Sequence, residues 1–508
     1  MRWTIVILCA LCISSCSNSS TQNQNRDEAR DTLNSQILLS SNEKMAQLLE
    51  HIQREIDPIE NEYRSNDRAE ILKKRIQNAS DYDKPNLYMQ YSIELLNAGR
   101  TNEALSILTR YLEILGMKYT DVDQQKKPLL ELLGICFLRK GEQDNCQNLH
   151  SVESCIMPIQ GTGVHQLKDG SNEAISIFQA ILDKWPDDHE IKYLMNVAYM
   201  TLGKYPDEVP DEYLLVGLAD PSQYSIPRFW DVAMDLGIAV NGLSGGCVLE
   251  DFNNDGYLDI MVSSWGFRDQ LRLFFNDGQG GYEDVTKSAG LTGLTGGLNM
   301  IHGDYNNDGF EDVFVLRGAW KDKNGLIPNS LLRNNGNGTF TDVTESSGLL
   351  AFNPTQTAAW ADFNLDGYLD LFVGNEKSQY VDAPYELYLN TGKDEFVEIS
   401  GTIGLEIAGF IKGVTWGDVN DDLFPDLYVS YMGGDNDLFL NKGGTNANNW
   451  SFENISTTAG TSEPFYSFPC WFWDYNNDGL QDIFVSGYDP RYMNKVCLLY
   501  TSPSPRDA

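Results

Sequence analysis

Histidine is scarce in this chain, and the scarcity removes several classes of enzyme. The 508 residues include five histidines, and none forms an HExxH pair or another recognisable metal spacing. A glycine-rich phosphate loop that ends in lysine is also missing, which excludes the common nucleotide-binding motif. His302 lies two residues before Asp304, where an inner strand is expected. A packed or pore-lining side chain is therefore favoured over a catalytic base.

The GxSxG pattern at residues 242–246 lacks the context of a catalytic serine. A nucleophile elbow needs a strand before the serine and a helix after it. Here a strand and an acidic loop follow, and a second Gly-Gly pair recurs at Gly296 and Gly297. We interpret the pattern as a glycine turn, and we expect no enzyme.

Basic residues are also few, with 37 lysines and arginines against 73 acidic residues and a net charge of −36. Such a surface repels nucleic acid and anionic membranes, so neither is expected as a partner. Acidic residues at a fixed spacing around a glycine indicate cation ligands, whereas scattered ones indicate a solvated surface.

Long apolar runs are missing except at residues 3–13, which are too few to span a bilayer. The run ends in Ile-Ser-Ser-Cys, which resembles the lipobox of bacterial lipoproteins. The resemblance implies a signal peptide at residues 1–15 and a lipidated Cys16, with plain secretion as the alternative. Ser17 in place of aspartate favours an outer membrane or cell-surface location. Residues 16–44 are then the lipidated cysteine and a flexible tether, which makes contact with the membrane through the lipid anchor only.

Nine cysteines are present, and those that remain after export would lie in an oxidising compartment. Cys146 and Cys155 are close in sequence and show no zinc spacing, so we predict a disulfide between them. Free buried thiols are the alternative for the others.

Residues 45–220 show helical periodicity, as in Leu87, Tyr91 and Leu95. The segment at 102–108 has a near copy at 172–178, which is 70 residues on (174 − 104 for the alanines). This is about twice a 34-residue period and resembles the tetratricopeptide repeat. The match is partial because residues 151–170 are irregular, so a helical bundle is the alternative. Such helices bind a peptide or act as a spacer.

Five acidic segments recur in residues 228–497. They read DFNNDGYLD at 251–259, DYNNDGFED at 304–312, DFNLDGYLD at 362–370, DVNDDLFPD at 418–426 and DYNNDGLQD at 474–482, with starts 53, 58, 56 and 56 residues apart. A fixed period of that size predicts a propeller or solenoid. An apolar strand follows each segment. Second, third and fourth strands, such as those around Leu273, Phe340 and Trp360, complete four strands per period, which is one propeller blade.

Oxygen atoms at loop positions 1, 3, 5 and 9 converge if the chain wraps tightly, and glycine at position 6 permits the positive φ of that wrap. With the carbonyl of position 7, they suit a hard cation of the size of calcium. The predicted ligands are Asp251, Asn253, Asp255, Tyr257 and Asp259; Asp304, Asn306, Asp308, Phe310 and Asp312; Asp362, Asn364, Asp366, Tyr368 and Asp370; Asp418, Asn420, Asp422, Phe424 and Asp426; and Asp474, Asn476, Asp478, Leu480 and Asp482.

We therefore expect up to five Ca²⁺ ions, with affinities on the order of 10⁻⁴ to 10⁻³ M by analogy with extracellular modules. The loop at Asp418 is the weakest match, because Leu423 replaces the glycine and Pro425 stiffens the turn. Five Asx-turns without metal are the alternative.

The loops are not EF-hands, because valine stands where an EF-hand needs a bidentate glutamate at position 12. A short loop closed by aspartate and followed by a strand resembles the FG-GAP or VCBS repeats of integrin-α-like propellers. The fold class expected is an N-terminal α-helical, tetratricopeptide-like region followed by an all-β propeller, with five recognisable repeats of an incomplete seven-bladed ring. A spare strand motif at 229–232, followed by Leu236 and Gly237, would complete the last blade and close that ring.

The order of signal, helices and repeats resembles the bacterial relatives of cartilage acidic protein, which carry an ASPIC/UnbV segment after the propeller. That segment is missing here, and residues 498–508 show no blade pattern and are similar to a translated sequencing adapter. We expect the tail to be non-native and the natural chain to be longer.

The function expected is that of a calcium-stabilised surface or periplasmic lipoprotein that binds protein or polysaccharide as an adhesin or scaffold. An extracytoplasmic hydrolase with its site at the propeller channel is one alternative. An assembly adaptor that acts through the helical repeats is the other.

Overall fold

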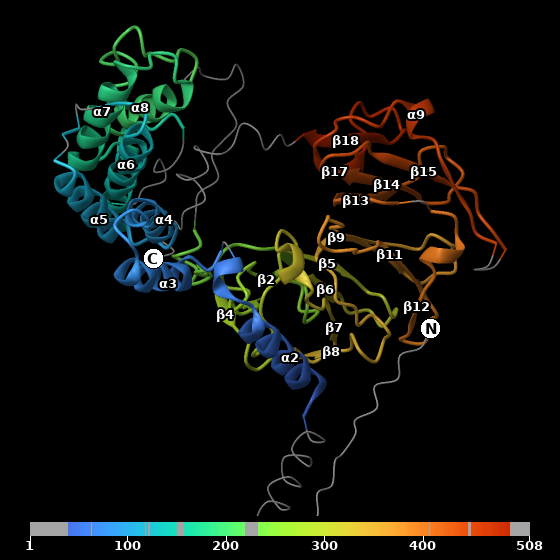
Figure 1. The fold of residues 1–508 in the computed structure, drawn as a ribbon. Helices are drawn as coiled ribbons and strands as arrows, with labels where there is room; N and C mark the ends of the chain where they lie inside the picture. Colours follow the sequence, from blue (N-terminus) through green and yellow to red (C-terminus); the bar gives the residue numbers. More distant parts are fainter. Residues whose placement is uncertain are drawn as a thin grey trace, which may run out of the picture.

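The computed structural model describes residues 39–61, 63–116, 118–119, 122–149, 157–218, 232–405, 407–445 and 449–487. Seven helices come first: α2 (Ser41–Glu55), α3 (Ser65–Asn78), α4 (Lys84–Asn97), α5 (Thr101–Ile114), α6 (Lys127–Leu149), α7 (Asp169–Leu182) and α8 (His189–Thr201). No helix within these ranges is both long and apolar enough to cross a membrane. Four-stranded antiparallel sheets follow (Figure 1).

Helices α3 to α8 form the helical region, which is built around one continuous apolar core from Ala69 to Tyr213. The two near-copy segments fall in α5 and α7, as their helical periodicity predicts. Small residues allow α6 and α7 to approach closely. A Cβ atom on Gly134 would lie 2.5 Å from the Phe178 ring, and one on Gly170 would lie 2.5 Å from the carbonyl oxygen of Phe137.

Helix α2 belongs to a different core. Ser40 caps it by accepting from the backbone N–H of Glu43, while the Glu43 carboxylate accepts from the N–H of Ser40. The helix thus begins inside the segment expected to be a tether. Met45 and Leu49 pack among the apolar residues of the first two sheets, and Figure 1 shows α2 beside β8.

Asn42 fixes the docking of α2 with three hydrogen bonds. Its Nδ2 donates to the carbonyl oxygens of Gly290 (2.8 Å) and Phe340 (2.9 Å), and its Oδ1 accepts from the N–H of Asp342 (2.7 Å). A Cβ on Gly293 would lie 2.8 Å from that of Ala46, so the helix rests almost directly on the backbone of the connection between sheets 1 and 2.

The strands form four complete sheets and one hairpin, here numbered sheet 1 to sheet 5. Sheet 1 contains β1 (Cys247–Glu250), β2 (Asp259–Val262), β3 (Arg272–Asn276) and β4 (Tyr282–Asp284), and sheet 2 contains β5 (Asn299–Gly303), β6 (Asp312–Leu316), β7 (Ser330–Asn334) and β8 (Phe340–Asp342). Sheet 3 contains β9 (Thr355–Ala361), β10 (Asp370–Asn375), β11 (Glu386–Asn390) and β12 (Phe396–Glu398). Sheet 4 contains β13 (Ile411–Gly417), β14 (Asp426–Tyr431), β15 (Asp437–Asn441) and β16 (Phe452–Asn454). Sheet 5 is the hairpin of β17 (Ser467–Trp473) and β18 (Asp482–Gly487).

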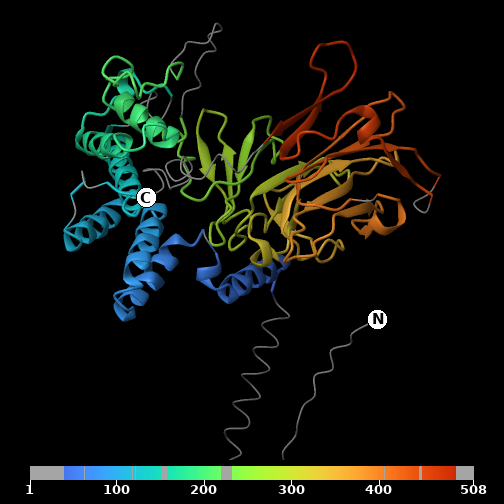
Figure 2. The ribbon, with the colours of Figure 1, turned by 45° about the horizontal axis from the view of Figure 1, so that its top comes forward.

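The sheets have the architecture expected of propeller blades. Neighbouring strands pair in sequence order, with registers such as Val248 opposite Met261 and Val313 opposite Leu332. The first strands β1, β5, β9, β13 and β17 contact one another in turn, so the sheets follow side by side (Figure 2). The four predicted strands per repeat are confirmed for sheets 1 to 4, and closure of a ring stays a prediction.

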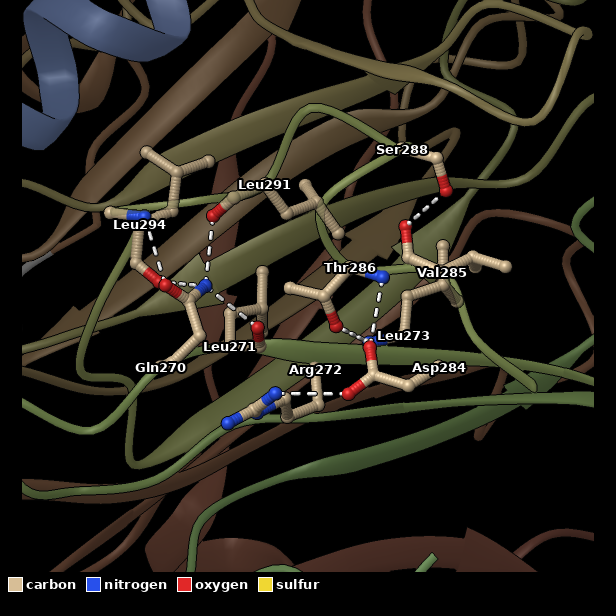
Figure 3. A network of polar contacts seen from close by, with 11 residues as sticks. Gln270, Leu271, Arg272, Leu273, Asp284, Val285, Thr286, Ser288, Leu291 and Leu294 are labelled. Atoms are coloured by element: carbon tan, nitrogen blue, oxygen red, sulfur yellow. Dashed lines mark hydrogen bonds and ion pairs between the residues drawn. The ribbon is translucent and has the colours of Figure 1, made fainter. Parts of the chain in front are cut away.

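A repeated polar contact ties the third strand of each complete sheet to the segment after the fourth strand. In sheet 1 the N–H of Leu273 donates to Oγ1 of Thr286 (3.0 Å), whose own N–H donates to Asp284 (3.0 Å); Figure 3 shows this network. A hydroxyl occupies the equivalent position in the other sheets, at Thr344, Ser400 and Ser456. These bonds explain why a hydroxyl residue follows the fourth strand of each complete sheet.

Several sequence predictions fall outside the described residues. They concern Cys16 and the signal, the Cys146–Cys155 pair, the motif residues 229–231 and the tail 498–508. Leu236 and Gly237, which follow that motif, lie in turns. Of the described cysteines, Cys136, Cys247 and Cys470 are free thiols. Burial raises the pKa of the Cys136 and Cys470 thiols to about 12, so they stay protonated and inert.

Candidate metal loops

The loop at 251–259 wraps around its own carboxylates. Asp251 accepts from the N–H groups of Asp255 (2.9 Å) and Gly256 (2.7 Å), so its two oxygens face the inside of the turn. Asn253 accepts from the N–H of Asp255 (3.0 Å) and donates through Nδ2 to the Asp255 carboxylate (3.0 Å). The side chains at positions 1, 3 and 5 thus gather on one turn, as the spacing predicts.

The same wrap recurs in all five loops. The N–H at position 6 donates to the position-1 carboxylate at 2.7–2.9 Å in each. Positions 4 and 6 both adopt the left-handed conformation, which is why glycine suits position 6. In the fourth loop Leu423 adopts it at φ 75°, so that loop keeps the fold of the others at the expense of backbone strain.

Position 7 uses its side chain to anchor the loop. The aromatic rings of Tyr257, Phe310 and Tyr368 lie over a turn glycine between the third and fourth strands of their own sheet. A Cβ on Gly278, for example, would lie 2.8 Å from the Tyr257 ring.

Position 9 differs from the other predicted ligands because it is buried. Asp259, Asp312, Asp370 and Asp426 are at most 1% exposed, whereas Asp482 in the terminal hairpin is exposed. Each buried carboxylate accepts from the backbone N–H of the asparagine that ends the third strand, at 2.7–2.9 Å. The second oxygen of Asp259 and Asp426 accepts from the position-2 N–H of the same loop, at 3.0 and 2.9 Å. In Asp312 and Asp370 that N–H is near but makes no full hydrogen bond, so among the described residues the buried oxygen is incompletely satisfied. Uncompensated burial of such an oxygen is costly, and a bound cation would remove that cost.

The electrostatics of position 9 agree with this burial. Desolvation raises the pKa of Asp259 and Asp426 to about 6 and that of Asp312 and Asp370 to about 8. The carboxylates at positions 5 and 1 of the same loop add to the rise, because like charges at short range disfavour ionisation.

The donor set fits a hard cation, but the carboxylates are turned to backbone groups. Among the residues that the structure describes, no set of three or more His, Cys, Asp and Glu side chains lies in the arrangement of a metal site. Carboxylates at positions 1 and 5 accept N–H bonds within the turn instead. Binding an ion would require some of these oxygens to exchange an N–H partner for the metal.

The loops are coupled from sheet to sheet. The third-strand asparagine of each later sheet donates through Nδ2 to the position-2 carbonyl of the preceding loop: Asn334 to Phe252 (2.8 Å), Asn390 to Tyr305 (2.8 Å) and Asn441 to Phe363 (2.9 Å). Position 4 makes a second link, because Asn254 donates to the Gly309 carbonyl (3.3 Å) and Asn307 to that of Gly367 (2.8 Å). Leu365 at this position in the third loop has no amide to continue that series.

Charged groups also gather at the opposite end of the sheets, near the first strands. Lys412 on β13 forms a buried ion pair with Glu376, and its Nζ lies 3.2 Å from the centroid of the Trp320 ring. Glu376 in turn accepts from the N–H of Trp320 (2.6 Å). The charges of Lys412 and Glu376 therefore compensate each other. His302 lies on the first strand β5, as predicted, but at the loop end of the sheet, with its ring 3.2 Å from Glu311 of the second loop.

The third-strand asparagines were not identified from the sequence as partners of the loops. Their recurrence at Asn276, Asn334, Asn390 and Asn441, one per period, was the signal that could have identified them as loop partners. The burial of position 9 had no such signal, because it depends on how neighbouring sheets pack.

Comparison with known proteins agrees with the repeat geometry. A model of the FG-GAP-like repeat matches residues 251–315, 304–373 and 362–429, so the chain carries FG-GAP-like repeats. Cartilage acidic protein 1 of Xenopus tropicalis is 31% identical over 157 residues, which is 30% of this chain and 22% of that protein. The protein of that name from Homo sapiens is 35% identical over 123 residues, or 23% of this chain and 16% of its own length. The similarity is distant, and the matched region spans about a fifth of these relatives.

Proposed function

We propose that this protein is a calcium-stabilised binding scaffold. The observation that carries the proposal is the repeated loop in which side-chain oxygens at positions 1, 3 and 5 gather on one turn, with a buried carboxylate at position 9. The incompletely satisfied buried oxygens of Asp312 and Asp370 support a cation at these loops. The ions would fix the edge of each sheet and so the shape of the surface that the loops form.

The test is calcium titration of the full chain by isothermal calorimetry, after removal of metal with EDTA. We expect up to five calcium ions to bind. The fourth loop, which has Leu423 at position 6, should bind its ion at the highest calcium concentration. Asp370→Asn should lower the stoichiometry by one, whereas Asp382→Asn, at an exposed ion pair outside the loops, should leave it unchanged. An absence of binding at millimolar calcium would remove the ion from the function.

The finer architecture belongs to the same proposal. We take the helical region to be tetratricopeptide-like, because α6 and α7 pack through glycines at helix-pair contacts. We take the sheets to be blades of an incomplete seven-bladed propeller. The chain would be an extracytoplasmic lipoprotein anchored through Cys16, at the outer membrane or cell surface, with protein or polysaccharide as its partner.

The charged groups described above already have partners within the protein, which favours a non-enzymatic role. The loop carboxylates accept hydrogen bonds within their turns, and Lys412 neutralises Glu376 next to the rings of Trp320 and Phe410. A general acid or base needs a proton that can be exchanged with a substrate. A mass-spectrometric screen of glycan and peptide digests incubated with the protein checks this, and turnover by the wild-type chain would refute it.

A further inference from the structure

A pocket of about 300 Å³ lies where the helical region meets sheet 2. One wall comes from the turn η1 (Pro58–Glu60) and the start of α3, through Glu60, Asn61, Tyr63 and Arg68. The other wall comes from the connection between β6 and β7, through Trp320 and Asp322. The pocket lies at the end of the sheets opposite the metal loops, because it is formed by the connection between second and third strands.

Contacts between the two walls hold this pocket open. Lys323 forms an ion pair with Glu60 (2.8 Å), and Asn324 donates to the Glu60 carbonyl oxygen (3.2 Å). Behind the first wall, Arg68 pairs with the buried Glu94 (2.7 Å). The shape is therefore set by bonds between groups of the protein and is present before any ligand arrives.

Asn61 supplies an unused donor. Its side chain is 4% exposed, and its Oδ1 accepts from the N–H of Tyr63 (3.0 Å), which fixes the amide. The Nδ2 group is buried and has no hydrogen-bond partner among the residues that the structure describes. A buried amide donor left unpaired destabilises the folded chain, so this group favours a ligand that brings an acceptor.

The opposite wall is strained. Trp320 and Asp322 both have positive φ angles, 63° and 47°, which side chains other than glycine rarely adopt. The N–H of Trp320 donates to Glu376, and the Ser378 hydroxyl donates to Asp322 (2.5 Å), so the surrounding structure holds the strained segment. Strain that is maintained in this way is typical of ligand sites.

The charges of the pocket select a neutral ligand. The lining includes two acidic residues, Glu60 and Asp322, and two basic residues, Arg68 and Lys321, so neither sign is in excess. Glu60 also pairs with Lys323, and Arg68 with Glu94. Two aromatic residues, Tyr63 and Trp320, line the same space as Asn61 and Asp322. Flat apolar surface next to both donors and acceptors suits a ring that carries hydroxyl groups.

We propose that this pocket binds a neutral saccharide of one or two rings, an inference that rests on the proposed binding function. The Asn61 amide would donate to a sugar oxygen, and the Asp322 carboxylate would accept from a hydroxyl. At about 0.3 kcal/mol per non-hydrogen atom, a monosaccharide of about 12 such atoms would bind with a Kd on the order of millimolar.

Saturation-transfer NMR on the full chain tests this with glucose, galactose, N-acetylglucosamine, cellobiose and the anionic glucuronic acid. We expect transfer to at least one neutral sugar and a weaker effect for glucuronic acid. Asn61→Asp keeps the Oδ1 acceptor for Tyr63 but replaces the donor with an acceptor, and should weaken binding at least tenfold. Asn78→Ala, an exposed asparagine on α3, is the matched control.

Three results would overturn the proposal: no transfer to any neutral sugar, equal transfer in Asn61→Asp, or preferential binding of glucuronic acid. Thermal melts of each variant verify that it is folded. Calcium titration separates this inference from its premise. If calcium binds and no sugar does, only the pocket assignment fails, whereas failure of both rejects the binding scaffold as well.

Discussion

The helical region and the sheet region are held together by different forces. Helices α3 to α8 share one apolar core that runs from Ala69 to Tyr213. The sheets are divided among four smaller clusters, and the clusters are bridged by the hydrogen bonds of asparagine and aspartate side chains. A continuous core needs no ion, whereas we expect an ion to stabilise a row of polar bridges that ends in crowded carboxylates. The difference predicts that the two regions respond separately to metal, mutation and pH.

The largest effect should come from calcium. At 10 mM calcium, sites with a Kd of about 10⁻⁴ to 10⁻³ M would each add about 1.4–2.7 kcal/mol to the sheet region. With several sites filled, its melting temperature should rise by at least about 10 °C, while the helical transition stays in place. Calorimetric melts with calcium and with EDTA measure both. Equal shifts of the two transitions would show that calcium does not stabilise the sheet region selectively.

The second effect concerns a single polar bridge. Asn390→Ala removes the donor to the Tyr305 carbonyl and leaves buried polar groups unpaired, so we expect the sheet transition to lose about 3 kcal/mol. Asn337→Ala, on an exposed turn, should change it by less than about 0.5 kcal/mol. Urea unfolding followed by tryptophan fluorescence provides the values. Similar losses in both variants would show that the bridges do not join the sheets.

The third effect is confined to the helical region. His165 is buried, and burial lowers its pKa from 6.5 to about 4. The folded state therefore binds fewer protons than the unfolded state between these values, and its stability is full above pH 6.5 and falls as the pH drops toward 4. The loss should reach about 3 kcal/mol.

His165→Gln should flatten this pH dependence of the helical transition, while His189→Gln, at an exposed position on α8, should not. Circular dichroism melts at half-unit pH steps provide the comparison. An unchanged slope in His165→Gln would assign the acid sensitivity to other groups.

The smallest effect separates the fourth loop from the rest. Leu423→Gly relieves a left-handed backbone at an exposed residue, so the sheet transition should gain about 1 kcal/mol. Leu258→Gly, also exposed but not left-handed, should lose about 0.5–1 kcal/mol. Differential scanning fluorimetry without calcium resolves the sign. A loss at both positions would mean that Leu423 carries no strain.

The local sequence pattern predicted the loops and the strands that follow them, because the features that define each loop lie within nine consecutive residues. The spacing from Asp251 to Asp255 dictates a turn, and the alternation after Asp259 dictates a strand, so the loops and the four-stranded sheets could be inferred. The burial of Asp259 could not, because it depends on Asn276 and on neighbouring sheets.

The local sequence pattern also could not predict where α2 packs. Ser40 and Glu43 form a capping signal that marks where the helix begins, and Met45 and Leu49 define an apolar face. Neither says which surface covers that face, and its partners lie some two hundred residues along the chain. The strained backbone at Trp320 likewise has no sequence signature, since it is imposed by Glu376 and the surrounding rings.

The position of α2 determines where mechanical load enters the protein. Because this helix is seated on sheets 1 and 2 through Asn42, Met45 and Leu49, a pull on the chain ahead of Ser40 reaches the sheets first. The helices from α3 onward follow this attachment in the chain, so they would not carry that tension. If the chain is anchored ahead of Ser40, force would thus pass through the sheets and leave the helical region free to engage a partner.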